Sequence, residues 1–276
     1  MEALSIQDKF AVLVVSCDKY SDLWEPFFEL FWRFWPDCPF NVYLLSNEKP
    51  FNYPKVVNIL IGKDVSWSDN LKRGLFQIKE DYVFLFIDDF FLVDYVKTDM
   101  VIKAFKWMLE NSANCVKMNS RQHPDKPYND LVGIISKGTI YRTTVMSVWK
   151  KNILLELLKD GESAWDFEIY GTVRSDKYDG FYSTWEDCFP VINGVIKGKW
   201  QKNVIKKLKS LGIEIDFKRH IMSKLEMMIL YSQEIRSKLF KTIIPTKYRR
   251  RVKDFILRGK YNYNRGLKLD EEKKNG

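Results

Sequence analysis

Histidine and cysteine are scarce in this chain, and they are not grouped as metal ligands. The 276 residues include two His and four Cys, and the sequence has no Cys-x-x-Cys pair and no Cys/His cluster. This scarcity argues against a structural zinc site. The four cysteines are expected to be ordinary buried thiols of a reducing compartment.

Long apolar runs are missing as well. No run of about 18 consecutive apolar residues occurs, so we expect no membrane-spanning helix. The residues before the first strand lack a basic segment, a long apolar segment and a cleavage site, so we expect no signal peptide. The strongest apolar stretches are Phe10–Val15 and Tyr82–Ile87, and both have the length of a β-strand.

Positive charge is concentrated in the C-terminal part of the chain. The net charge is +9. From Lys218 to Gly276 there are 17 Lys/Arg against 6 Asp/Glu, whereas residues 1–217 have 28 against 30. A body so close to neutral argues against a nucleic-acid groove, so nucleic acid is not an expected partner.

Aromatic residues are plentiful, with nine Trp, fourteen Tyr and nineteen Phe. Because hydrophobic residues make up 46% of the chain, there is enough material for a large core. Aromatic faces also pack on the apolar C–H faces of sugars. Each ring is therefore a candidate either for the core or for a carbohydrate-binding cleft.

The alternation of strand and helix patterns predicts an α/β fold with a mixed, mainly parallel sheet and helices on both faces. We expect strands at 10–15, 41–45, 56–61, 82–87, 115–118, 139–148 and within 189–196. We expect helices at 23–35, 69–79, 98–109, 150–159 and 201–211. Residues 171–184 are rich in Gly, Ser, Asp and Tyr, which predicts a mobile loop and a candidate lid over a bound donor.

Two adjacent carboxylates, Asp88 and Asp89, directly follow the strongest strand. In open α/β sheets, ligands bind at the carboxyl ends of the strands. Burying both charges would cost on the order of several kcal/mol unless a divalent cation offset them. Mg²⁺ and Mn²⁺ prefer few carboxylates plus phosphate oxygens, which a nucleoside diphosphate sugar supplies. The pattern predicts such a metal site, with a strand cap or a pairing with lysines as the alternative.

The order of strand, polar loop, helix and then strand followed by Asp-Asp resembles that of the GT-A glycosyltransferases. Their acidic motif, usually written DxD, ends a strand and holds the metal–diphosphate, and Ile87-Asp88-Asp89-Phe90 takes that place here. The stretch SVWKKNILLELLKDGESAWDFE at 147–168 and the GKW at 198–200 resemble a bacterial surface-polysaccharide subgroup. The resemblance covers residues 8–212.

This resemblance implies a nucleotide-sugar donor and a glycan or lipid-linked acceptor in the synthesis of lipopolysaccharide, O-antigen or capsule. It also implies a transferase of the hexosyl type. Two features depart from the family pattern. The carboxylates are adjacent, and neither His123 nor His220 lies where the family's late histidine ligand is expected.

An inverting transfer needs a carboxylate that takes the proton of the acceptor hydroxyl. Asp166 and Glu168 are the candidates, and Asp166 is preferred. The resemblance favours this segment as the acceptor side, with Trp165 and Arg142 as candidate acceptor contacts. The alternative is that Asp166 or Glu162 caps a helix and that Trp165 belongs to the core.

Further residues are candidates for binding the donor together with Asp88. Ser16 and Asp18 follow the first strand, Arg73 lies on the helix before the acidic strand, and Lys199 follows Gly198, which would permit a close backbone approach. A turn or N-cap role for Asp18 remains open. For Arg73 and Lys199, the alternative to donor binding is a solvent-exposed position without a ligand.

The C-terminal part reads as basic amphipathic helices. Residues 221–244 carry apolar residues at helical spacing, and basic residues follow Pro245. Each Lys or Arg near an anionic leaflet contributes on the order of 1 kcal/mol. Residues 246–268 are the preferred membrane-binding segment, whereas 221–244 have packing on the body as an alternative.

These patterns divide the chain into a GT-A catalytic domain at 1–215 and a basic amphipathic extension at 216–276. The donor-binding half is expected at about 1–120 and the acceptor half at about 121–215. The predicted protein is a metal-dependent glycosyltransferase of the cytoplasm, peripheral on the inner face of the cell membrane. A sugar nucleotidyltransferase and a non-catalytic basic membrane-binding module are the alternatives.

Overall fold

The computed structural model of the chain describes residues 6–118, 124–216 and 218–257. Within them, nine strands form one sheet in the order β3-β2-β1-β4-β9-β6-β10-β8-β7. In this order the strands are Val56–Leu60, Asn41–Ser46, Phe10–Val15, Tyr82–Ile87, Ser147–Lys150, Cys115–Lys117, Phe181–Thr184, Val132–Ile134 and Lys126–Pro127.

Most strands of this sheet run in one direction. β3, β2, β1 and β4 pair in parallel, and β6 pairs in parallel with β10. β9 lies antiparallel between β4 and β6, and β8 is antiparallel to both β10 and β7. The predicted fold class, a mixed and mainly parallel sheet, is confirmed. The carboxyl ends of β1, β4 and β6 therefore meet at the same edge of the sheet.

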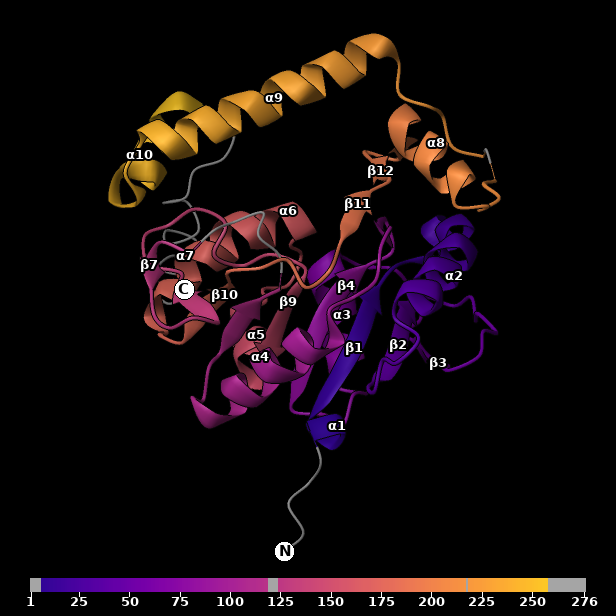
Figure 1. Cartoon of the computed structure of the whole chain (residues 1–276), viewed down its shortest axis with the longest axis horizontal. Coiled ribbons are helices and arrows are strands. Elements are labelled where there is room, and N and C mark those ends of the chain that lie inside the picture. Colours follow the sequence, from indigo (N-terminus) through magenta and orange to yellow (C-terminus); the bar gives the residue numbers. More distant parts are fainter. Residues whose placement is uncertain (1–5, 119–123, 217, 258–276) are drawn as a thin grey trace, which may run out of the picture.

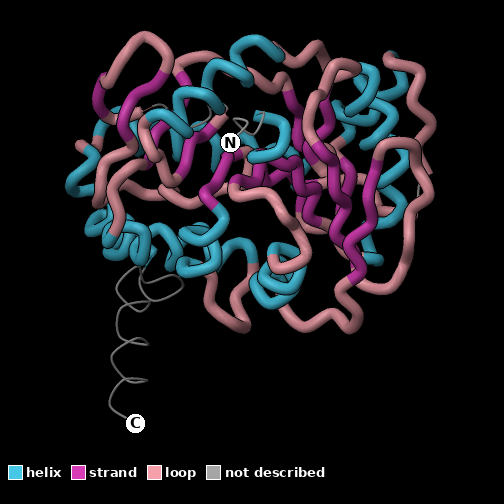
Figure 2. The backbone as a smooth tube through the Cα atoms, turned by 90° about the horizontal axis from the view of Figure 1, so that it is seen from below, coloured by secondary structure: helices cyan, strands magenta, loops and turns pink. Residues whose placement is uncertain are grey.

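Helices cover both faces of the sheet, as Figures 1 and 2 show. Successive residues of β1 point to opposite faces, so Val12 and Val14 join one core and Leu13 joins the other. The first core contains side chains of α2 (Trp24–Phe34), α4 (Thr98–Glu110) and α8 (Lys202–Ser210). The second contains side chains of α3 (Trp67–Leu75) and α5 (Lys151–Leu157).

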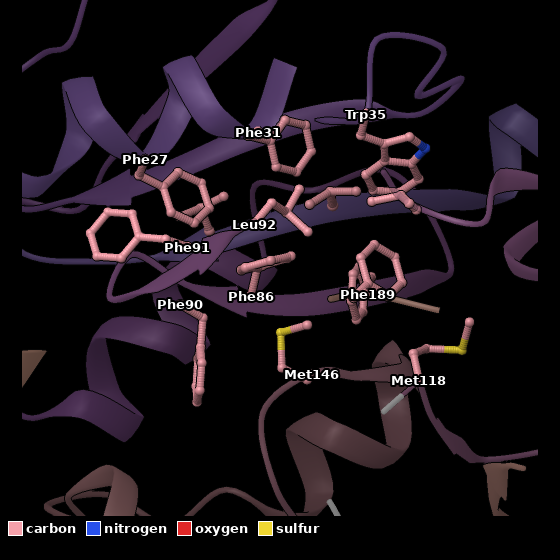
Figure 3. Close-up of a cluster of buried hydrophobic side chains, with 14 of the residues drawn as sticks. Phe27, Phe31, Trp35, Phe86, Phe90, Phe91, Leu92, Met118, Met146 and Phe189 are labelled. Carbon is pink, nitrogen blue, oxygen red and sulfur yellow. The ribbon is translucent and has the colours of Figure 1, made fainter. Parts of the chain in front are cut away.

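Aromatic rings dominate the first core, as Figure 3 shows. Phe27 from α2 packs edge-on against Phe86 of β4 at 5.3 Å between ring centroids, and Phe189 lies 6.1 Å from Phe86. Edge-to-face pairs of this kind stabilise a core beyond the area that they bury. For these rings, the core interpretation of the aromatic richness is confirmed.

The strands predicted at 10–15, 41–45, 56–61, 82–87 and 115–118 are present within about one residue. The strand predicted at 139–148 is wrong over most of its length, because only Ser147–Lys150 pair in the sheet. Tyr141 and Met146 adopt positive φ values of 55° and 58°, which interrupt an extended strand.

The mobile loop predicted at 171–184 is also wrong. Its first part is helical, with α7 (Thr172–Arg174) and a 3₁₀ turn at Ser175–Lys177, and its last part is β10. Thr172, Ser175 and Ser183 are fully buried. Buried hydroxyls gave this segment the composition of a loop. Residues 171–175 and 181–184 are mostly buried, and only the stretch around Lys177 to Asp179 reaches the surface.

After α8, the described C-terminal part contains α9 (Lys224–Ile243) and α10 (Thr246–Leu257). Figure 1 shows α9 passing over the sheet from the side of α8 to α10. Figure 1 shows β11 (Val191–Asn193) and β12 (Val195–Ile196) below its N-terminal half. β11 pairs with β5 (Phe90–Leu92), and β12 pairs with β13 (Lys199–Trp200). Among the described helices, none is both long and apolar enough to cross a membrane.

The remaining short elements lie between these. They are α1 (Ile6–Lys9), a 3₁₀ helix at Asp18–Leu23, α6 (Ala164–Asp166) and a π-helical turn at Phe167–Gly171.

Candidate active site

Asp88 and Ser16 meet at the carboxyl edge of the sheet. β1 and β4 are paired so that their last residues, Val15 and Ile87, lie side by side. The residues that follow, Ser16 after β1 and Asp88 after β4, are therefore neighbours. The Ser16 hydroxyl donates a hydrogen bond to Asp88 Oδ2, and Trp24 Nε1 donates to Ser16 Oγ at 2.7 Å. Asp88 is only 5% exposed. The strand register thus builds a buried, oriented carboxyl group.

Burial raises the pKa of Asp88 well above its usual range, and the neighbouring charge of Asp89 raises it further. The hydrogen bond from Ser16 and the charge of Arg219 lower this pKa, but burial is the largest effect. An ionised Asp88 is therefore costly in the protein alone. A cation at this position would favour the ionised form.

Arg219 comes to this site from the C-terminal side of the chain. Its guanidinium forms two hydrogen bonds of 2.6 Å with the carboxylate of Asp22 and one of 2.8 Å with the Lys19 carbonyl. It also lies 4.1 Å from the centre of the Tyr20 ring. Burial raises the pKa of Tyr20, Arg219 lowers it, and Asp88 and Asp89 raise it. Sequence reasoning missed Arg219 and Tyr20, because Arg219 lies 197 residues from its partner Asp22.

A cleft of about 980 Å³ opens beside Arg219. Pockets that take small ligands typically have about 300–1,000 Å³. Basic and acidic side chains both line it, so it is a polar cleft. Its walls are Lys19, Ser21, Asp22, Glu25, Pro26, Glu29, Lys49, Gly212, Glu214, Ile215, Asp216, Lys218 and Arg219.

The backbone at Asp89 is held in place by residues 193–201, the segment that contains β12 and β13. Gly194 N–H donates to the Asp89 carbonyl at 2.7 Å, and Gln201 N–H donates to the Gly194 carbonyl at 3.0 Å. A Cβ atom at Gly194 would lie 2.3 Å from the Phe91 ring. Only glycine allows this approach without a shift, so residues 193–201 set the position of the Asp-Asp turn.

The predicted donor residues other than Ser16 and Asp88 have structural partners. Asp18 accepts hydrogen bonds of 3.0–3.3 Å from the backbone N–H groups of residues 47–49, and it thereby joins the loops after β1 and β2. Arg73 is exposed and donates to two carbonyls just after β3, and Lys199 pairs with Glu226 of α9 at 2.6 Å. Their contacts with a donor stay predictions.

Gly198 serves a turn. Ile196 pairs with Lys199, which leaves Lys197 and Gly198 as a two-residue hairpin loop with φ values of 51° and 75°. Positive φ at both positions is the geometry that such a loop requires. A Cβ at Gly198 would meet nothing within 4 Å. The glycine is therefore explained by its backbone conformation, and the close approach of a donor to it stays a prediction.

Arg142, expected at the acceptor, is a buried structural residue instead. It is 2% exposed and donates to the carbonyls of Ile135 at 3.2 Å, Ser175 and Tyr178 at 3.1 Å. Its guanidinium stacks 3.9 Å from the centre of the Phe181 ring. A side chain enclosed in this way does not reach an acceptor, so this part of the prediction is wrong.

We expect Arg142→Met to lower the free energy of unfolding by on the order of 3 kcal/mol, because three buried carbonyls would each lose a charged donor. Urea denaturation measures this loss. Arg142→Lys should rescue little, because an ammonium does not reproduce the planar fork. Unchanged stability together with a raised KM for the acceptor would restore the original interpretation.

The two candidate bases have different surroundings. Asp166 Oδ2 accepts from Ser163 N–H at 3.0 Å and Ser163 Oγ at 2.6 Å, which completes a capping box at α6. The alternative role of Asp166 as a cap is thus present. Glu162 forms an ion pair of 2.6 Å with Arg174, and Trp165 is 63% exposed, so it does not belong to the core.

Glu168 lies in the π-helical turn Phe167–Gly171, and such turns occur frequently at functional sites. Burial raises the pKa of Glu168 to about 7, and the charges of Lys117 and Lys253 oppose this rise. Burial lowers the pKa of Lys117, which ends β6 and is 1% exposed, to about 7. Of the two candidates, Glu168 is the one with the environment of a general base at neutral pH.

Tyr141 connects Lys117, which acts on Glu168, with α10. Lys117 Nζ donates to the Tyr141 carbonyl, and Lys253 Nζ donates to the Tyr141 hydroxyl and lies 3.9 Å from the ring centre. Burial lowers the pKa of Lys253 to about 8. The carboxyl end of β6 thus carries a second set of titrating groups at the same edge of the sheet as that of β4, with β9 between the two strands.

The metal prediction rests on Asp88 and Asp89. Across residues 6–118, 124–216 and 218–257, no three His, Cys, Asp or Glu side chains gather around one point. A pair of carboxylates fits a Mg²⁺ or Mn²⁺ ion that takes its other ligands from phosphate and water. It does not fit a closed structural site. His123 lies outside the described residues, and His220 is exposed with its carbonyl bonded to Trp200 N–H at 2.9 Å.

No family model matches the chain, and no curated protein matches it by sequence. Its fold is similar to S. aureus TarS 1–349 in complex with UDP-GlcNAc, with a TM-score of 0.43 and 13% identity over 63% of this chain and 58% of that chain. For the complex of TarS 1–349 with UDP, the values are 0.43 and 13% over 63% and 60%. For the bifunctional IspDF from Campylobacter jejuni, they are 0.35 and 14% over 60% and 47%. The chain thus spans less than two thirds of each of these structures.

Proposed function

We propose that this chain is a glycosyltransferase that moves a sugar from a nucleoside diphosphate sugar to a glycan or lipid-linked acceptor. The observation that carries the proposal is the buried carboxyl group of Asp88 at the end of β4, with Ser16 bonded to it and Asp89 beside it. Such a pair binds a divalent cation together with a diphosphate. When bound, Mg²⁺ or Mn²⁺ would neutralise the charge on the leaving diphosphate.

The residues around this pair would bind and orient the donor. Ser16 holds Asp88 in one orientation, and the polar cleft that begins at Lys19 and Arg219 offers room for the nucleotide. The charge of Arg219 already acts on Asp88, and the two carboxylates raise the pKa of Tyr20, so we propose that both side chains lie at the approach to the carboxylates. Donor binding is proposed for the half of the chain at about 1–120.

The acceptor is proposed to bind in the half at about 121–215. Glu168 takes the proton of the attacking hydroxyl, and the sugar is transferred with inversion. The exposed ring of Trp165 suits contact with a sugar face. The proposed setting is the synthesis of a bacterial surface polysaccharide such as lipopolysaccharide, O-antigen or capsule, at the inner face of the cell membrane.

A sugar nucleotidyltransferase is the second candidate, because it also uses carboxylates and a metal. Such an enzyme is expected to have a Gly-rich basic loop after the first strand. Between Val15 and Trp24 this chain has no glycine, and the 3₁₀ helix Asp18–Leu23 fills that place. Release of pyrophosphate from a nucleoside triphosphate and a sugar phosphate would favour this second function.

A thermal-shift panel of UDP, GDP, CDP and TDP, each with and without Mn²⁺, tests the proposal. One nucleotide with Mn²⁺ should raise the melting temperature selectively, by roughly 5–10 °C at about 100 times its Kd. Asp88→Asn should abolish the part of the shift that depends on Mn²⁺. If no nucleotide stabilises the chain under either condition, the proposed donor site is wrong, and the non-catalytic membrane-binding alternative gains support.

A further inference from the structure

Helix α9 carries a row of large apolar side chains that the rest of the protein leaves uncovered. They are separated by three, seven, four and four residues, so they lie along one side of the helix. Each is 55–69% exposed, and no residue of α9 is buried. We call this row the α9 stripe; it consists of Leu225, Met228, Ile235, Leu239 and Ile243.

The opposite side of α9 faces the protein and is fixed at both ends. Near the N-terminus, Glu226 pairs with Lys199 at 2.6 Å and completes a capping box with Ser223. Near the C-terminus, Phe240 packs against a small buried cluster around Ile169. The helix therefore crosses from the β12–β13 hairpin to α10 (Figure 1). The exposure of the α9 stripe places it on the outer side of this helix.

The charges on α9 favour an anionic surface as the occupant of the stripe. Lys224, Arg236 and Lys238 are exposed. Of the two acidic residues of α9, Glu226 is paired with a lysine of the body and Glu234 is exposed, so the exposed charge is net positive. A second copy docking stripe to stripe would gather the cations of both helices along one contact, and like charges oppose that contact. A bilayer with anionic headgroups matches both the apolar row and the cations beside it.

The basic residues of α10 are used differently. Arg250 donates to the Thr139 carbonyl at 2.9 Å and to the carboxylate of Asp176, and Arg249 donates to the Ile244 carbonyl at 2.8 Å. The contacts of Arg250, the bond from Lys253 to Tyr141 and the ion pair of Arg249 with Asp125 at 3.9 Å dock α10 on the body, whereas the Ile244 carbonyl belongs to the end of α9. Lys247 and Arg251 of α10 are exposed. For the described part of residues 246–268, the preferred membrane segment of the sequence, this docking makes α9 the better candidate.

We propose that α9 lies parallel to the surface of an anionic bilayer, with the α9 stripe buried among the acyl chains and Lys224, Arg236 and Lys238 at the lipid phosphates. About 20 residues of helix span about 30 Å of surface. Because α9 lies across the sheet on the side where β1 and β4 end, the carboxyl edge with Asp88 then faces the membrane (Figure 1).

This orientation deepens the proposed function, on which it rests, by naming the acceptor class. In this orientation only the thickness of α9 separates the carboxyl edge of the sheet from the bilayer. A site at that distance suits an acceptor that is anchored in the bilayer. The acceptor is therefore a glycan on a lipid carrier, and its sugar end reaches the carboxyl edge of the sheet from the membrane side.

The experiment compares two double variants of the full chain in co-sedimentation with vesicles of phosphatidylglycerol and phosphatidylcholine in equal proportion. Leu225→Glu/Leu239→Glu changes the α9 stripe, and Phe255→Glu/Ile256→Glu makes the same change in charge and apolarity on the exposed part of α10. We expect binding to fall on the order of tenfold or more for the α9 variant and little for the α10 variant. Pure phosphatidylcholine vesicles and high salt should weaken binding of the unmodified chain.

Two results would overturn the proposal. One is equal binding by the α9 variant and the unmodified chain; the other is a dimer in light scattering that only the α9 variant converts to a monomer, which would mean that a second copy covers the stripe. Circular dichroism checks that α9 remains helical. Because vesicle binding is read without any donor, its failure is distinguishable from a failure of nucleotide stabilisation in the thermal-shift panel.

Discussion

Asp88→Asn is expected to reduce sugar transfer on the order of 10²- to 10³-fold or more while the chain stays folded. The amide keeps the shape and the hydrogen bond to Ser16, but it removes the charge that would hold a cation on the diphosphate. Initial rates with the matching donor, measured over a Mn²⁺ titration, check this result. Mn²⁺ should no longer stimulate the variant.

A second measurement separates loss of function from loss of structure. Burial raises the pKa of Asp88, so the ionised carboxylate is less favourable in the folded chain than in the unfolded one. The stability penalty grows as the pH rises above the pKa of the unfolded carboxyl. Asp88→Asn should therefore melt at a higher temperature than the unmodified chain at neutral pH without metal, and the difference should vanish in acid.

The exposed Asp130→Asn serves as the matched control, since it also exchanges a carboxylate for an amide. It should change neither the rate nor the melting temperature. Full activity in both Asp88→Asn and Asp89→Asn would end the assignment of the carboxylate pair. A metal-independent enzyme whose rate falls only in Asp89→Asn would leave Asp88 as a structural residue.

The part of the site that sequence reasoning found depends on neighbouring strands. Phe10–Val15 and Tyr82–Ile87 are continuous apolar runs, and such runs form buried parallel strands whose ends meet at one edge. The meeting of Ser16 with Asp88 follows from that register. Local pattern and sheet geometry together were sufficient for this pair.

The contacts that were missed join distant or disguised residues. Arg219 reaches Asp22 across 197 positions, and no local pattern announces such a pairing. In residues 171–184, Thr172 and Thr143 bond to each other at 3.1 Å, and Ser175 donates to the Thr172 carbonyl at 2.7 Å. Polar groups that satisfy one another inside a core look like a loop in the sequence.

The preference for Asp166 shows the same limit. Both carboxylates lie in one short stretch, and sequence spacing does not separate a cap from a base. The capping box of Asp166 and the buried environment of Glu168 become visible only in the structure. Single substitutions of Asp166 and of Glu168 distinguish their roles.

Glu168→Gln is expected to lower the transfer rate by about 10²- to 10⁴-fold, the usual contribution of a general base. Burial raises the pKa of Glu168 from its usual 4.5 to about 7, so the base form prevails only above about pH 7. The unmodified enzyme should show a rate that rises with pH near 7. Glu168→Gln should lose this rise, and pH–rate profiles at saturating donor and acceptor check both points.

Two further variants make this prediction specific. Asp166→Asn should keep the rise near pH 7 and cost about 1 kcal/mol of stability through its weakened cap. Lys117→Met removes a positive charge that lowers the pKa of Glu168, so the rise should move to higher pH. If Glu168→Gln retained the rise and Asp166→Asn lost it, the proton would pass to Asp166. The proton would then be taken by Oδ1, because Oδ2 of that carboxylate already accepts two hydrogen bonds from Ser163.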